Sequence, residues 1–288
     1  MRTANRLLGY PDDARLLIIN GDDLGLDACA NAGVAQAITC GVACSTSLMV
    51  PCPGAAGGLR WLAARSEVSF GLHITLVRDS RAHLWPPLSP PETIPSLLGP
   101  EGQYHLHDGS HRLPPGARLP EVEAETRAQI EAVLSAGLRP AHLDWHCLLD
   151  GGREDVFELT LGLAREYGLA LRVAGGERIG RLQRMGLPTA DRAFLDSFSI
   201  PTGDKPARYL QLLRDLPEGL SEWALHPAAD AGETLRDAPD RAVRAADLAF
   251  LTSEAAREAV SREGIVLLDY RPLQAAWRGA PAPGQAGA

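Results

Sequence analysis

One stretch near the N-terminus, residues 16–25, organises the rest of the chain, and it reads Leu16-Leu17-Ile18-Ile19-Asn20-Gly21-Asp22-Asp23-Leu24-Gly25. Its four leading apolar residues indicate a short strand that is buried on both faces. The strand runs directly into two adjacent carboxylates. Like charges at the end of a buried strand are costly, and chains accept that cost mostly where a cation or a proton transfer requires it. The alternative is that Asp22 and Asp23 only open a turn and cap the next helix.

The composition is that of an ordinary globular protein. The chain has 288 residues, enough for one α/β barrel-sized domain or two smaller ones, and 45% of them are apolar and 22% charged. A net charge of -8 argues against nucleic acid or an anionic membrane surface as a partner. No apolar run approaches the ~20 residues of a membrane span, and the N-terminus lacks a signal-peptide pattern. The sequence therefore predicts a cytoplasmic protein.

The cysteines do not indicate a structural cross-link. Their number is odd and no Cys-x-x-Cys pair occurs, so neither a disulfide framework nor a zinc knuckle is expected among Cys29, Cys40, Cys44, Cys52 and Cys147. Cys147 follows a histidine and is a candidate nucleophile, although a small buried hydrophobe is the commoner role of such a residue.

The order of the elements in the first third of the chain indicates parallel βα units. Helices are expected from Asp27 to about Thr39 and again to about Arg65, and strands over 42–50 and 68–76. In the strand over 68–76 the period of two places His73 on the face with small polar residues. That face is expected to form the interior or upper rim of a barrel.

The segment 78–120 is too long for a simple connecting loop and too rich in proline for regular helices or central strands. A loop of this kind commonly forms a lid or a substrate wall. Its aromatic residues, Trp85 and Tyr104, can stack on a ligand ring or pack the loop onto the barrel. Its histidines, His105, His107 and His111, have no compelling spacing for a metal site.

A second polar cluster follows a helix predicted over 119–138, and it reads Ala141-His142-Leu143-Asp144-Trp145-His146-Cys147. In a strand, His142, Asp144 and His146 all project to one side. In a helix, His142 and His146 still align, because they are four residues apart. Ionisable groups at this density are hard to explain as core filling, so the cluster is a candidate site.

The rest of the chain is expected to continue the alternation of helices and strands. Residues 175–208 are expected to be irregular with one short helix, and the tail 279–288 to be disordered. The other predicted elements are helices over 154–167, 209–216 and 242–260, and strands over 170–173 (with Arg172), 221–225 (leading to His226, Pro227 and Asp230) and 265–270.

Four polar motifs therefore follow different predicted strands: Asp22-Asp23, His73, His142-x-Asp144-x-His146 and His226-Pro227. Barrels and open α/β sheets assemble their sites at the carboxyl ends of parallel strands. Two imidazoles and one carboxylate around an open position make a catalytic metal centre. A second carboxylate left unligated would serve as the general base for the attacking water.

Five motifs, in this order and spacing over roughly residues 15–272, carry a family resemblance. They are Ile19-Asn20-Gly21-Asp22-Asp23-Leu24-Gly25, Ser45-Thr46-Ser47-Leu48-Met49-Val50, Gly71-Leu72-His73, His142-Leu143-Asp144-Trp145-His146 and His226-Pro227. Together they resemble the YdjC/ChbG (ChbG/HpnK-like) carbohydrate deacetylases. The resemblance implies a distorted (β/α) TIM-like barrel of the polysaccharide-deacetylase type, as a single domain over 1–278 with 78–120 as a Pro-rich lid or insertion.

The same resemblance implies metal-dependent removal of an N-acetyl group from an amino sugar, either chitooligosaccharide-like or linked to a glycolipid. By motif, Asp23, His73 and His146 would hold one divalent cation, with zinc or magnesium favoured. Asp22 would be the catalytic base, and His226 a catalytic acid or a stabiliser of the oxyanion and leaving group. Groups that orient the ligands or bind the substrate would be His142, Asp144, Arg172 and Trp85.

Three features of the chain depart from the family pattern, one of which is that the strand with Arg172 lacks the proline that relatives often have nearby. Relatives often continue the third motif with further histidines, whereas this chain continues with Cys147-Leu148-Leu149, and the usual Phe after the aspartate pair is Leu24. These differences leave the metal ligands intact and affect the sugar pocket. Two other functions stay open: a metal-dependent hydrolase of a phosphoester or cyclic amide, and a catalytically silent sugar-binding protein on the same scaffold. Homo-oligomerisation also stays open.

Overall fold

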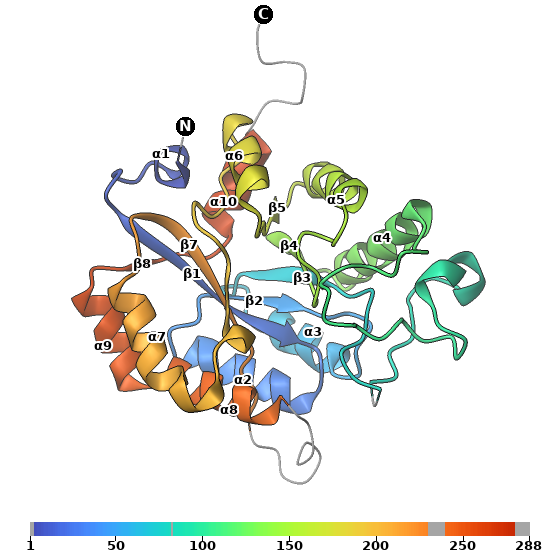
Figure 1. Ribbon diagram of the computed structural model, residues 1–288, viewed down its shortest axis with the longest axis horizontal. Helices are drawn as coiled ribbons and strands as arrows, with labels where there is room; N and C mark the ends of the chain where they lie inside the picture. Colours follow the sequence, from blue (N-terminus) through green and yellow to red (C-terminus); the bar gives the residue numbers. More distant parts are fainter. Residues whose placement is uncertain (1–2, 82, 230–239, 280–288) are drawn as a thin grey trace, which may run out of the picture.

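The computed structural model describes residues 3–81, 83–229 and 240–279 (Figure 1). Within these residues eight parallel strands form one sheet, in the order β5-β4-β3-β2-β1-β7-β6, with β8 paired to β1. The predicted α/β class and distorted barrel are confirmed, because this sheet is parallel throughout and β5 and β6 stand at the two ends of its pairing order. The strands are β1 (Arg15–Leu24), β2 (Ser45–Leu48), β3 (Phe70–Ile74), β4 (His142–Trp145), β5 (Ala170–Leu171), β6 (Leu195–Asp196), β7 (Gly219–Leu225) and β8 (Val266–Leu267).

Helices flank the sheet. Figure 1 shows α7, α8 and α9 together beside β1 and β7, while α4 and α5 lie beside β3 and β4. Within the described ranges, every helix is too short or too polar to span a membrane. The α-helices are α1 (Ala4–Leu8), α2 (Ala28–Thr39), α3 (Ala55–Ala63), α4 (Leu119–Ser135), α5 (Glu154–Tyr167), α6 (Gly176–Arg184), α7 (Lys205–Arg214), α8 (Arg241–Leu251), α9 (Glu254–Arg262) and α10 (Arg271–Gly279).

Capping residues account for two helix boundaries. Asp27 caps α2 as predicted, and its carboxylate accepts a hydrogen bond from the Ala30 backbone N–H at 2.8 Å. The helical stretch predicted over 242–260 consists of two helices, because Ser253 separates α8 from α9. Its hydroxyl accepts a hydrogen bond from the Ala256 N–H and donates one to the Phe250 carbonyl. A serine that bonds to the backbone on both sides competes with the continuous helix.

Strand β1 pairs with three other strands of the sheet. It pairs with β7 along one edge, and along the other edge with β8 at its start and with β2 at its end. The register with β2 shifts between Gly21 and Leu24, where the two aspartates lie. Asp23 itself has a φ of 71°, in the left-handed region that a non-glycine residue rarely adopts. The aspartate pair therefore occupies an irregular segment that departs from the regular pleat.

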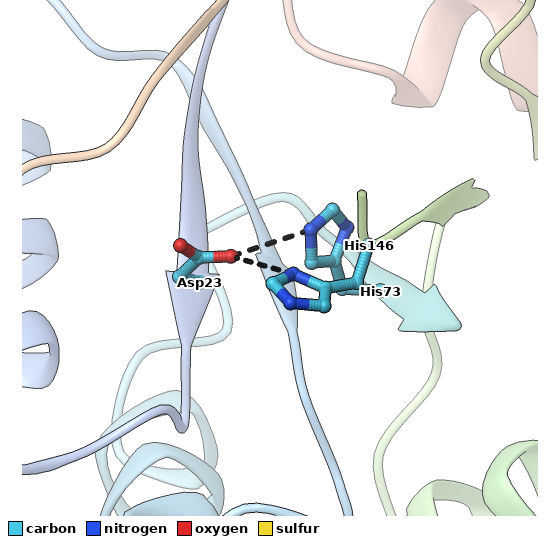
Figure 2. Close-up of side chains that lie close together, drawn as sticks. All are labelled: Asp23, His73 and His146. Atoms are coloured by element: carbon cyan, nitrogen blue, oxygen red, sulfur yellow. Dashed lines mark ion pairs between the residues drawn. The ribbon is translucent and has the colours of Figure 1, made fainter. Parts of the chain in front are cut away.

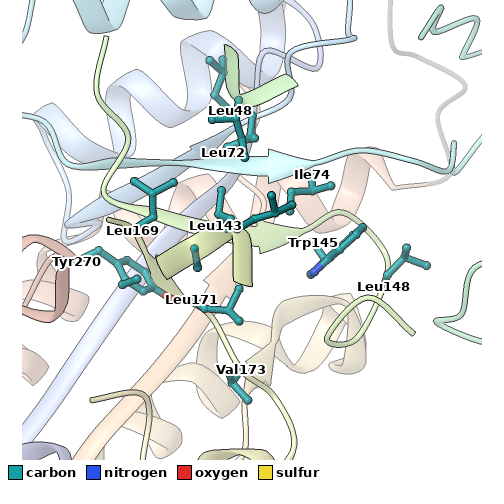
Figure 3. Packing of buried hydrophobic residues seen from close by; sticks show 14 of the residues in the cluster. Leu48, Leu72, Ile74, Leu143, Trp145, Leu148, Leu169, Leu171, Val173 and Tyr270 are labelled. Atoms are coloured by element: carbon teal, nitrogen blue, oxygen red, sulfur yellow. The ribbon is translucent and has the colours of Figure 1, made fainter. Parts of the chain in front are cut away.

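The alternation of β1 divides the core into two clusters. Leu16 and Ile18 belong to the larger cluster, whereas Leu17 and Ile19 pack in the other with residues of α7, β7 and α8. Figure 3 shows part of the larger cluster, in which side chains of β3 and β4 meet those of β5. All four β1 residues are at most 1% exposed. Burial of each stabilises the fold by about 1.5–3 kcal/mol.

The Pro-rich segment over 78–120 packs onto α4. Glu125 accepts hydrogen bonds from the backbone N–H groups of Leu88 and Ser89 at 3.0 and 2.8 Å. The Tyr104 hydroxyl donates to the same carboxylate at 2.6 Å, and Tyr104 is fully buried. The sequence left two roles open for Tyr104, stacking on a ligand ring and packing of the loop. The structure shows that Tyr104 packs the loop.

Gly25 makes the turn that follows the aspartate pair. Its φ is +95°, and a Cβ there would lie 2.7 Å from the Met49 carbonyl oxygen. We expect Gly25→Ala to lower the free energy of unfolding by about 2 kcal/mol or more, because backbone strain and a steric clash add. Urea unfolding measures the loss. Gly102→Ala is the control: φ is +71° but the space is open, so only about 1 kcal/mol is expected. If the two variants lost the same free energy of unfolding, a steric clash at Gly25 would be excluded.

Candidate metal centre and active site

Two buried carboxylates at the end of β1 are each paired with an arginine. Arg172 donates two hydrogen bonds to Asp22, Nη1 to Oδ2 at 2.8 Å and Nη2 to Oδ1 at 2.9 Å. Arg244 Nη2 lies 2.7 Å from Asp23 Oδ2. Burial raises the pKa of each carboxyl, but the neighbouring guanidinium and the histidines together outweigh it and hold the pKa below the ordinary value, furthest for Asp23. Both aspartates are therefore charged at neutral pH.

The free oxygen of Asp23 faces two histidines from other strands (Figure 2). Asp23 Oδ1 lies 3.3 Å from His73 Nε2 and 3.4 Å from His146 Nδ1, and all three residues are buried. This oxygen has no hydrogen-bond partner among the described residues. Ligands at 2.0–2.1 Å from a tetrahedral zinc ion lie about 3.3 Å apart. The orphaned oxygen and its two imidazole neighbours therefore fit a divalent cation.

A carboxylate behind His73 fixes the orientation of its ring. His73 Nδ1 lies 2.8 Å from Asp144 Oδ1, so Nδ1 carries the proton and Nε2 is left for the cation. Asp144 is also 3.0 Å from Arg172 Nη1 and 3.4 Å from His142 Nε2. His142 stays outside the Asp23, His73 and His146 set, because its ring stacks on Tyr270 with the centroids 3.6 Å apart. Asp144 thus supports the candidate ligand His73, with His142 behind it.

Arg172 is the centre of a buried ion network. Besides Asp22 and Asp144, it donates from Nε to Glu222 Oε1 at 2.6 Å, and the Tyr270 hydroxyl also bonds to Glu222. Burial lowers the pKa of Arg172, but the three carboxylates raise it well above the ordinary value. Its guanidinium is therefore committed to protein carboxylates.

His226 also lies near Asp22, with Nε2 at 4.0 Å from Asp22 Oδ2. Its other nitrogen, Nδ1, is 3.0 Å from Ser197 Oγ, and that hydroxyl donates to Asp247 Oδ2 at 2.6 Å. Asp247 also accepts from the His226 backbone N–H at 2.9 Å and pairs with the buried Lys205 Nζ at 2.8 Å. The ring is thus held through a serine, and Nε2 is left to face the site.

One pocket of about 750 Å³ unites the motifs that were separate in the sequence. Its lining includes Asp22, Asp23, His73, His146, Arg172 and His226. Trp85 also borders it but is only 1% exposed, since its ring stacks on His83 and meets His146 edge-on. The role of Trp85 in substrate binding stays a prediction. Asp230 and residues 280–288 of the expected tail lie outside the described residues.

Several residues of the site carry no sequence signal of their own. Arg244 and Asp247 belong to α8, and charged residues on an amphipathic helix usually face solvent. Ser197 lies in η3 (Ser197–Ser199), inside the stretch expected to be irregular. Glu222 is on β7, where alternation with the apolar Trp223 and Leu225 does not distinguish a buried ion pair from a solvated face.

A buried His-His-Asp set at the carboxyl edge of a parallel sheet is typical of metal-dependent enzymes. The chain belongs to the YdjC-like protein family, which matches residues 16–262. A carbohydrate deacetylase from Thermoanaerobacter pseudethanolicus is 28% identical over 260 residues, covering 90% of this chain and 100% of that one. A chitooligosaccharide deacetylase from Proteus mirabilis is 28% identical over 269 residues, covering 90% and 99%.

The fold is also similar to a solved structure. A crystal structure from Enterococcus faecalis, described as that of a cellobiose-phosphate cleavage protein, superposes with a TM-score of 0.75 at 27% identity. The match covers 90% of this chain and 99% of that one. The likeness therefore extends over most of the chain.

Proposed function

We propose that this chain is a metal-dependent hydrolase that removes an N-acetyl group from an amino sugar. The observation that carries the proposal is the buried set of Asp23, His73 and His146. A second carboxylate, Asp22, lies next to this set without belonging to it. The relatives named as carbohydrate and chitooligosaccharide deacetylases support the reaction class. Two nitrogen ligands and one oxygen ligand favour zinc over magnesium, which prefers oxygen.

The neighbouring residues provide the proton transfers that amide hydrolysis needs. When bound, a divalent cation supplies a Lewis acid for the acetyl carbonyl and lowers the pKa of water. Asp22, charged and fixed by Arg172, accepts the proton of the attacking water. His226 Nε2 faces the same space and donates a proton to the departing amine. In this proposal Asp22 is the general base and His226 is the general acid.

Release of acetate tests the proposal directly. The purified chain, loaded with zinc, is incubated with N-acetylglucosamine and with short chitooligosaccharides, and acetate and free amine are both measured. We expect them in equal amounts. Sugar binding without acetate would favour the silent scaffold, and turnover of a phosphoester or cyclic amide instead would favour the other hydrolases. Arg172 is committed to protein carboxylates and is not free to clamp a phosphate, which weighs against a phosphoester. The cytoplasmic location stays a prediction.

Ser197 is expected to act by positioning His226. We expect Ser197→Ala to lower kcat on the order of tenfold with KM little changed, because the ring loses its link to Asp247. Ser197→Thr keeps the hydroxyl and should restore the rate. Ser199→Ala is the control, since that hydroxyl bonds to the Asp196 carbonyl of the same turn. A similar loss in both alanine variants would point to damage of the turn instead.

A further inference from the structure

His146 has candidate ligand atoms opposite both of its ring nitrogens. Nδ1 faces Asp23 Oδ1 at 3.4 Å, within the set described above. Nε2 lies 3.3 Å from Cys147 Sγ and 3.9 Å from Asp79 Oδ2. The ligand atoms of Asp79, His146 and Cys147 all lie within 4.8 Å of one another. The ring thus stands between two groups of donors.

The backbone brings Cys147 to the same side as His146. Neighbouring residues of a strand point to opposite faces, but β4 ends at Trp145 and Cys147 has a φ of 58°. Its carbonyl accepts a hydrogen bond from His111 Nδ1 at 2.8 Å, which fixes this left-handed residue against the Pro-rich segment. The conformation is unusual for a non-glycine residue, and it places the thiol beside the imidazole.

Asp79 approaches His146 from a different segment. It lies just beyond β3, where the Pro-rich segment begins, and its Oδ1 is 2.5 Å from His83 Nδ1. Its Oδ2 is left for His146. Asp79, His146 and Cys147 all line the pocket, and the Asp79 side chain is 25% exposed, so solvent ions can reach the group.

We propose that Cys147 Sγ, Asp79 Oδ2 and His146 Nε2 form a second cation site, selective for thiophilic ions such as zinc or cadmium. In a tetrahedral zinc site, nitrogen and sulfur ligands lie about 3.6 Å apart and nitrogen and oxygen ligands about 3.3 Å apart. Here His146 Nε2 is 3.3 Å from Cys147 Sγ and 3.9 Å from Asp79 Oδ2, so the Asp79 carboxylate would move inward by roughly half an ångström on binding. A thiolate with an imidazole and a carboxylate selects zinc-like ions over magnesium.

Binding at this site releases protons and transfers no electrons. A cation at this site would be held by the Cys147 sulfur as a thiolate and by His146 Nε2, and the protons displaced would pass to solvent. Because the second ion occupies the pocket wall beside the first, we expect excess zinc to inhibit turnover. This regulation goes beyond the proposed reaction, and the site can be detected without any substrate.

Cadmium binding tests the proposal through a signal that only a thiolate gives. Wild-type protein is titrated with cadmium chloride, and the ultraviolet charge-transfer band between thiolate and cadmium is recorded at each step. Equilibrium dialysis gives the number of cadmium ions bound per chain. We expect a saturable band in the wild type. Cys147→Ser should lack the band and bind one cadmium fewer. Cys40→Ser is the matched control, because Cys40 is an exposed thiol at the end of α2, and it should keep both signals.

Two further variants separate this site from the first one. Asp79→Asn should weaken the cadmium affinity reported by the band, while His73→Ala should lose the first ion and keep the band. Circular dichroism confirms that each variant folds. A band that persists in Cys147→Ser, or a wild type that shows none, would overturn the proposal. Neither result depends on whether the chain is a deacetylase, since acetate release is not measured.

Discussion

Asp22→Asn is expected to lower kcat by a factor of about 10²–10⁴ while the cation stays bound. The amide has nearly the shape of the carboxylate but cannot accept the proton of the attacking water. Asp22 lies outside the candidate ligand set, with Oδ2 3.9 Å from His73 Nε2. Arg172 keeps Asp144 and Glu222 as partners, so the substitution does not leave a buried charge unpaired.

Three measurements on this variant separate the roles of the two aspartates: kcat for acetate release, zinc content, and the midpoint of thermal unfolding. We expect only kcat to change greatly. Loss of zinc with a normal rate per remaining zinc would mean that Asp22 is the ligand and Asp23 the base. Asp27→Asn is the matched control, since Asp27 lines the same pocket but caps α2, a role that asparagine also fills.

The sequence predicted the parts of the site that depend on strand order. Asp23, His73 and His146 lie at or just beyond the carboxyl ends of β1, β3 and β4, and parallel strands bring those ends to one edge. Alternation likewise places His142 and Asp144 on one face of β4. Hydrophobic pattern and strand period therefore suffice for side chains that the sheet itself positions.

What the sequence could not predict depends on how helices and loops dock. Arg244 reaches Asp23 only because α8 packs beside β7, and nothing within α8 marks one arginine as buried. His142 shares a face with Asp144, yet its ring turns to Tyr270. Gly71 permits this, since a Cβ there would lie 2.4 Å from the His142 ring. Such contacts join segments far apart in the chain and leave no periodic signal.

His73→Ala is expected to reduce acetate release by at least about 10³-fold, because Lewis-acid catalysis worth several kcal/mol is lost with the cation. Asp144 keeps Arg172 as its partner, so the core around β4 should stay folded. Asp144→Asn should have a graded effect: the ligand remains but its orientation weakens, and zinc affinity should fall about 10–100-fold. Competition with a chelator measures that affinity, and acetate release measures the rate.

Chelation and re-addition of zinc distinguish a metal centre from a hydrogen-bonded cluster of buried groups. In a metal centre, chelation of the wild type reproduces the loss of activity in His73→Ala, and added zinc reverses it only in the wild type. His107→Ala is the control, because His107 lines the pocket outside the Asp23, His73 and His146 set, and it should keep zinc and rate. If His73→Ala retains stoichiometric zinc and full turnover, the orphaned oxygen of Asp23 needs another explanation, and the proposed hydrolase loses its catalytic centre.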